Sequence, residues 1–104
     1  MRRLDFTVEG QKLSKEGDFS HIVKGSKGYL KCNFLLRDND WATCKIAVAF
    51  SVGSTEIAVR LEPDRTCVIP DEITDKRCFK VQLIGLSESG TKILTNKVII
   101  EQEG

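Results

Sequence analysis

Alternation of polar and apolar residues runs through most of this 104-residue chain and constrains its fold more than any other feature. In the first such run, Leu4, Phe6 and Val8 alternate with polar neighbours. Side chains two residues apart lie on the same face of a β-strand, so each run predicts a strand with one buried face. The apolar positions of the later runs are Leu30, Cys32, Phe34 and Leu36; Ile46, Val48 and Phe50; Ile57, Val59 and Leu61; Phe79, Val81 and Leu83; and Val98 and Ile100.

Turn-forming residues separate these runs. Gly, Pro, Asp, Asn and Ser gather at 25–28, 37–40, 52–54, 62–64 and 87–90, and each of these residue types favours a bend for its own conformational reason. Short strands at such regular spacing are typical of a β-sandwich or a small barrel. The sequence therefore predicts an all-β fold.

Two segments depart from this pattern. A short helical turn is predicted at Pro70–Ile73, where a proline stands at the start and acidic residues follow it. Residues 1–28 are the least defined part of the chain, because much of this stretch is polar and contains glycine. We predict a single β-sandwich domain over 1–104, with 1–28 as an exchanged or peripheral segment.

The charge balance argues against nucleic acid and membranes as partners. Sixteen Lys and Arg against fifteen Asp and Glu leave a net charge of +1, which gives no broad field to attract either polyanion. No apolar run approaches the roughly 18 to 20 residues that a membrane span needs. The two arginines near the N-terminus are not followed by the apolar stretch of a secretory signal.

The four cysteines form no metal or redox motif. No Cys-x-x-Cys pair occurs among Cys32, Cys44, Cys67 and Cys78, and His21 is the only histidine. By strand parity the first three cysteines point inward as small core side chains, and Cys78 is exposed. An even number also permits disulfides under oxidising conditions, and their connectivity stays open.

Catalytic motifs are lacking as well. The chain has no nucleophile elbow, phosphate-binding loop or zinc-protease motif, and a nucleophile–histidine system would depend on His21 alone. The loop Asp38–Asp40 does not continue as a calcium site, since Thr43 and Ala49 stand where glycine and glutamate are required. We therefore predict that the protein is not an enzyme and has no catalytic, cofactor-binding or metal-ligating residues.

Two residues are candidates for binding a partner. Trp41 follows a polar turn, where its ring either caps one end of the sandwich or anchors a contact. Ile99 belongs to the run 97–100, which is apolar on both strand faces. Such a strand is either central in a sheet or covered by a partner subunit.

Several short motifs occur in a shared order from residue 29 onward. They are Tyr29-Leu30, Phe34, Asp40-Trp41, Ala47–Phe50, Cys67–Glu72, Phe79–Val81 with Gly85, and Thr95-Asn96. Over residues 29–102 this order resembles small immunoglobulin-like domains of virion proteins from tailed phages that infect Gram-positive bacteria. The N-terminal part of baseplate upper proteins and tail or capsid-decoration modules are examples. The resemblance implies an immunoglobulin-like antiparallel β-sandwich of about seven to eight strands.

The same resemblance implies a function through protein contacts. It indicates a non-enzymatic structural or assembly module of the tail, baseplate or capsid decoration, located in the virion or in the host cytoplasm during assembly. The expected partners are other virion subunits or a host protein, and low net charge favours a homo-oligomer. Two alternatives stay open: a small phage-encoded inhibitor that blocks a host defence enzyme, and a bacterial surface or carbohydrate-binding domain.

Overall fold

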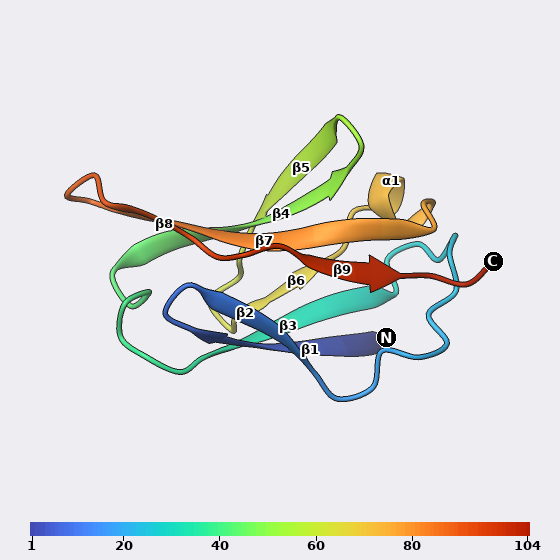
Figure 1. Cartoon of the computed structure of the whole chain (residues 1–104), viewed down its shortest axis with the longest axis horizontal. Helices are drawn as coiled ribbons and strands as arrows, with labels where there is room; N and C mark the ends of the chain where they lie inside the picture. Colours follow the sequence, from blue (N-terminus) through green and yellow to red (C-terminus); the bar gives the residue numbers. More distant parts are fainter.

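Two β-sheets packed face to face make up the protein, as a computed structural model describing residues 1–104 shows (Figure 1). The predicted all-β sandwich is confirmed, with nine strands in place of seven to eight. The helical turn predicted at Pro70–Ile73 is also present, displaced by one residue. The elements are β1 (Arg2–Glu9), β2 (Lys12–Glu16), β3 (Leu30–Leu36), β4 (Cys44–Val52), β5 (Thr55–Arg60), β6 (Thr66–Val68), α1 (Asp71–Thr74), β7 (Cys78–Ser87), β8 (Lys92–Leu94) and β9 (Val98–Glu101).

The strand order differs from a purely antiparallel sandwich at one pair. The first sheet has the order β2-β1-β3-β6; the second has the order β5-β4-β7, with β8 and β9 both pairing with β7. All strand pairs are antiparallel except β1 and β3, which run parallel with Leu4 opposite Cys32. The β1–β2 hairpin is followed by the connection 17–29, which leads back to the end of the sheet where β1 begins. This return makes β3 parallel to β1.

The N-terminal strand is interior to its sheet, and the description of residues 1–28 as an exchanged or peripheral segment stays a prediction. β1 lies between β2 and β3, and Leu4, Phe6 and Val8 are buried in the core. Arg2 fixes the returning connection, because its guanidinium donates hydrogen bonds to the carbonyls of Ser20 (2.7 Å) and His21 (3.0 Å). Three alternating apolar side chains thus secure β1 in spite of the polar segment that follows.

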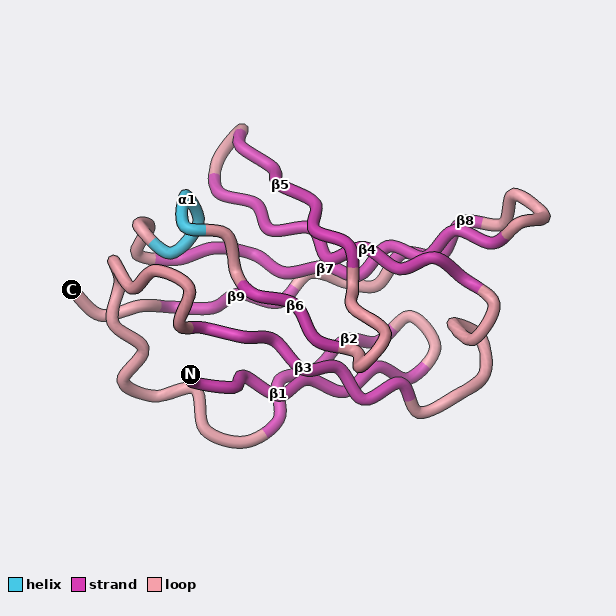
Figure 2. The backbone as a smooth tube through the Cα atoms, turned by 180° about the vertical axis from the view of Figure 1, so that it is seen from behind, coloured by secondary structure: helices cyan, strands magenta, loops and turns pink.

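The core side chains lie between the two sheets, whose layers Figure 2 shows from behind. Phe6 stacks on Phe34 with ring centroids 4.9 Å apart in the first sheet, and Phe50 meets Phe79 edge to face in the second. Inward positions predicted from alternation are buried in β1, β3, β4 and β7. Partly buried members of the predicted set are Leu36, Ile57, Val59 and Val98.

The β4–β5 hairpin projects from one side of the molecule. Figures 1 and 2 both show its tip standing clear of the other elements. Ile57 and Val59 on β5 are therefore only half-buried, although their parity matches that of buried Val48 and Phe50 on β4. Elsewhere in the fold, none of the helical structure has the length and apolar character needed to cross a membrane.

Candidate protein-contact surface

Trp41 closes one end of the sandwich and is fully buried. Its indole Nε1 donates a hydrogen bond of 2.9 Å to the carbonyl of Gly10 in the β1–β2 turn. Its ring packs against Gly85 of β7, where an added Cβ would lie 2.7 Å from a ring carbon. Trp41 thus joins the two sheets, in agreement with the end-capping interpretation. With 0% of its surface exposed, it has none to offer a partner.

The loop before Trp41 is a structural turn. A carboxylate oxygen of Asp38 accepts a hydrogen bond from the backbone N–H of Gly10, and its other oxygen accepts one from Asp40 at 3.1 Å. Asp residues commonly bond the backbone of a turn in this way. Nowhere in the structure do three or more His, Cys, Asp or Glu side chains gather closely enough to hold a metal ion.

Ile99 lies on an edge strand, which excludes a central position for β9. This strand pairs with β7 alone, and Lys80 is the residue opposite Ile99. The Ile99 side chain is 49% exposed, while its carbonyl accepts a hydrogen bond of 3.1 Å from the Lys15 ammonium of β2. Coverage by a partner is the alternative that stays open for this side chain.

Ile99 is one member of an apolar surface on the outer side of the second sheet. Parity directs this side chain to the same side as Leu86 and Leu94, which are 52% and 39% exposed. Small alanine side chains occupy the neighbouring outward positions on β4 and β5. We call this surface the apolar face; its members with exposed or partly exposed side chains are Ala47, Ala58, Ile84, Leu86, Leu94 and Ile99, and the polar Gln82 of β7 interrupts it between Ile84 and Lys80.

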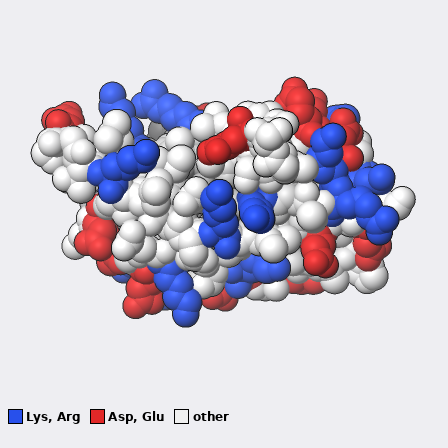
Figure 3. All heavy atoms as spheres, turned by 45° about the horizontal axis from the view of Figure 1, so that its top comes forward, with Lys and Arg blue, Asp and Glu red and all other residues white.

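Cations surround and interrupt the apolar face. Figure 3 shows this side obliquely, with uncharged atoms in broad areas and blue side chains standing among them. The charged side chains with outward parity are Lys45, Arg60, Lys80 and Lys92, against Glu56 and Glu101. None of them forms a salt bridge within the chain. An apolar centre with an unpaired, mainly positive periphery is suited to a protein surface with an acidic rim.

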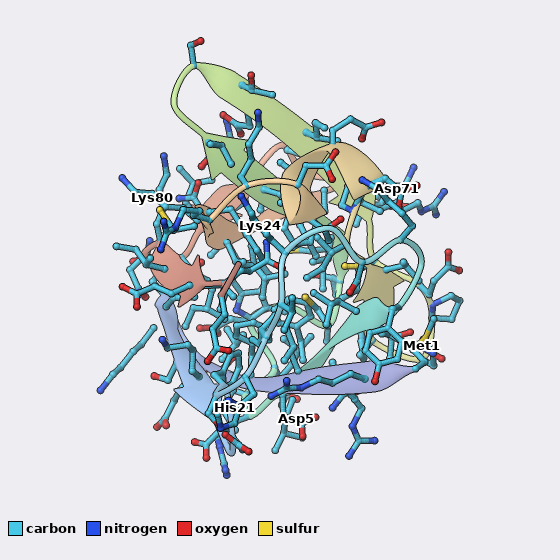
Figure 4. All side chains as sticks on the ribbon, turned by 90° about the vertical axis from the view of Figure 1, so that its right-hand side faces the viewer. Met1, Asp5, His21, Lys24, Asp71 and Lys80 are labelled. Atoms are coloured by element: carbon cyan, nitrogen blue, oxygen red, sulfur yellow. The ribbon has the colours of Figure 1, made fainter.

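The outer side of the first sheet is polar, and its groups bind one another. Asp5 accepts from the Arg3 guanidinium at 3.0 Å and from the Asn33 amide at 3.1 Å. Thr7 donates to Glu16 at 3.4 Å across the β1–β2 pair. Figure 4 shows Asp5 on this side and Lys80 on the other. We call this surface the polar face; it consists of the outward side chains of β1, β2 and β3.

A shallow groove of about 290 Å³ borders the apolar face beside Ile99. It separates the turn 51–56 from the paired strands β7 and β9, and Lys80 and Lys97 also line it. The groove is open and mixed in polarity, so it extends the contact surface and does not form an enclosed ligand site.

The cysteines are free thiols in this structure. Cys32 and Cys67 are buried and directly opposite each other on β3 and β6, and burial raises the pKa of the Cys32 thiol. Cys78 is exposed, as parity predicts, whereas Cys44 is only partly inside the sandwich. Cys44 is the first residue of β4 and follows the loop that carries Trp41, where the core no longer covers its side chain completely.

His21 and two aspartates serve local structure in the loops. His21 is exposed on the connection 17–29, with Nδ1 3.3 Å from a carboxylate oxygen of Glu103. Hydrogen bonds from Ser20 lower the pKa of Asp18, and those from Thr66 lower the pKa of Asp64. These interactions tie each aspartate to a residue two positions along the chain.

Sequence reasoning selected Ile99 but missed the larger part of the apolar face. The segment 83–86 reads Leu-Ile-Gly-Leu and is apolar on both strand parities, which is the same signal that singled out 97–100. Comparison with known proteins adds no relative, since no family model, curated protein or solved structure matches the chain.

Proposed function

We propose that this protein is a non-enzymatic module that works by protein–protein contact, as a structural or assembly part of a phage virion. The observation that carries the contact role is the apolar face, where Leu86 and Leu94 stand exposed near each other and Ile99 stands exposed further along the same side of the sheet. Contiguous exposed apolar surface on a small domain is typical of an interaction site. The virion assignment rests on the resemblance of residues 29–102 to modules of tail, baseplate and capsid-decoration proteins.

The apolar face supplies part of the energy of a specific contact. Leu86, Leu94 and Ile99 are each exposed by two fifths to one half. Covering these side chains contributes about 2–4 kcal/mol in all, on the basis of 1.5–3 kcal/mol for complete burial of each. The small side chains of Ala47 and Ala58 let a partner approach the sheet closely, so the contact includes the backbone surface beside them.

The charges on this face favour a virion or host subunit with an acidic rim over a second copy placed face to face. Two apolar faces brought together would set Lys45, Lys80 and Lys92 near one another, and like charges at an interface cost several kcal/mol. Carboxylates on a different protein would pair with these cations.

Affinity purification with the full chain tests this function. Tagged protein expressed in a bacterial culture that produces the phage encoding it is expected to recover virion proteins. The Ile99→Lys variant should lose them, because it places a charge in the contact. The control Leu35→Lys alters a residue of similar exposure, 52%, on the polar face and should retain them. Recovery of a single host enzyme would replace the virion proposal with the inhibitor alternative, and equal recovery by both variants would contradict the role of the apolar face.

A further inference from the structure

The outer edge of β5 carries backbone groups with no partner in the chain. Ile46 and Leu61 continue the register of the β4–β5 ladder by one pair. The N–H of Leu61 donates to the carbonyl of Ile46, so these two residues form a hydrogen-bonded pair. Such pairs alternate along an antiparallel ladder, so the N–H and C=O groups of Glu56, Ala58 and Arg60 point away from β4. These groups make no other hydrogen bond within the chain.

The other sheet edges are closed or short. At the β2 edge, the Asn96 side chain accepts from Leu13 N–H at 2.7 Å and donates to the Leu13 carbonyl at 3.1 Å. At β9, Lys15 covers the Ile99 carbonyl. β6 has three residues between Pro63 and Pro70, and proline and short length both limit pairing with another strand. β5 is six residues long, and its hairpin stands clear of the body (Figure 1).

The sequence of β5 is complementary to itself. If two β5 strands pair antiparallel about Ala58, Glu56 lies opposite Arg60 of the second copy, and Arg60 opposite Glu56. On the inner side Ile57 lies opposite Val59, so charge meets opposite charge and apolar meets apolar. The small Ala58 side chains meet at the centre without crowding. This register also pairs the free backbone groups of Glu56, Ala58 and Arg60 on both strands.

The two charges have no role inside the monomer. Across the β4–β5 pair, Glu56 lies opposite Ser51 and Arg60 opposite Ala47. Neither charge forms a salt bridge within the chain. Both side chains are exposed, as is Ala58 between them. The partner that best satisfies this edge is therefore a second β5.

We propose that two copies of this chain dock edge to edge through β5, across a two-fold axis at Ala58. The second sheets of both copies then form one continuous sheet, since paired antiparallel strands are related by a two-fold axis perpendicular to the sheet. The apolar faces lie on the same side and join into one surface. This dimer does not rest on the proposed function, because a monomer would present the same apolar face.

Sedimentation of the full chain over about 10–500 µM tests the dimer. The wild-type chain is expected to form dimers. Glu56→Arg and Arg60→Glu should each weaken association about tenfold, because two attractive cross-strand pairs become repulsive. An equimolar mixture of these two variants should associate as well as wild type does, since each edge then meets its opposite. A strict monomer at the highest concentration, or no recovery in the mixture, would overturn the proposal.

Two further variants separate docking from folding. Ala58→Pro removes an N–H that does not bond to β4, and proline is tolerated at such edge positions. This variant should keep the wild-type circular dichroism spectrum and lose the dimer. Lys12→Glu, a charge reversal on β2 of the polar face, should leave the dimer unchanged. A dimer that survives Ala58→Pro, or that Lys12→Glu disrupts to the same degree as Arg60→Glu, would contradict pairing through β5.

Discussion

The two outer faces of the sandwich differ in the kinds of side chain that they expose to water. On the polar face, charged and amide side chains alternate with the buried core and bond to one another, as Asp5 does with Arg3 and Asn33. On the apolar face, alanine, isoleucine and leucine occupy equivalent outward positions, and the nearby charges have no partner in the chain. An antiparallel sheet exposed on one side normally alternates apolar inside and polar outside. The apolar face breaks this rule.

This difference separates surface that folding requires from surface that folding does not require. The core of both sheets is formed by their inner side chains, so folding stability does not require an apolar exterior on one of them. Leu35 is an isolated apolar residue among the polar groups of β3, and scattered residues of this kind need no explanation. Leu86 has the same exposure but belongs to a group. We infer that grouping, more than exposure, distinguishes a contact residue.

The largest effect on stability is expected at Trp41, because this interior residue joins the two sheets. Trp41→Ala removes the ring between the β1–β2 turn and β7, and should reduce the free energy of unfolding by about 3–5 kcal/mol. Urea denaturation followed by circular dichroism measures this change. Wild-type stability in Trp41→Ala would mean that the two sheets hold together without this end closure.

A smaller loss is expected on the inner side of β7. Gly85→Ala places a methyl group against the Trp41 ring, and such overpacking costs about 1–3 kcal/mol. The adjacent outward substitution, Leu86→Lys, should change stability by less than about 0.5 kcal/mol, as surface positions usually do. Equal destabilisation by the two variants would mean that the apolar face is part of the folding core.

The closed edge near β2 should contribute somewhat less. Asn96→Ala removes two hydrogen bonds to the backbone of Leu13, and we expect a loss of about 1–2 kcal/mol. Hydrogen exchange at Leu13 should accelerate at the same time, because its amide loses its acceptor. Unchanged exchange at this amide would contradict the role of Asn96 in closing the edge.

The smallest effect concerns pH and the turn before β6. Hydrogen bonds from Thr66 hold the pKa of Asp64 below its ordinary value of 3.8. A lowered pKa in the folded state stabilises the protein above the pKa of the unfolded state, and this contribution disappears as pH falls through the folded value. Asp64→Asn should therefore show a slightly weaker loss of stability between pH 5 and 2 than wild type, as urea titrations at each pH would measure. An identical pH dependence in both proteins would contradict this assignment.

The interior of the fold could be predicted from the sequence, whereas the exterior could be predicted only in part. Alternation identified Phe6, Val48 and Val81 as core residues, because burial of one strand face leaves a period of two. The parallel pairing of β1 with β3 was not predictable, since it depends on the path of the polar connection 17–29. Pattern alone does not determine where such a segment returns.

The apolar face could be predicted only in part for a related reason. Ile99 was found because its run is apolar on both strand parities, but Leu94 lies in a three-residue strand whose register with β7 only the structure supplies. Trp41 was ambiguous in sequence, because a tryptophan beside a turn serves an interior or an interface equally well. Its hydrogen bond to Gly10 and contact with Gly85 place it in the interior.

The most direct test of the central claim is to measure the affinity of the recovered partner for two variants, Leu86→Lys and Leu35→Lys. Both variants change a leucine of 52% exposure to lysine, and they differ only in the outer face that carries it. We predict a loss of about a hundredfold for Leu86→Lys, in the range of interface hot spots, and less than about threefold for Leu35→Lys. Equal affinities for the two variants, or a larger loss for Leu35→Lys, would contradict the assignment of protein contact to the apolar face.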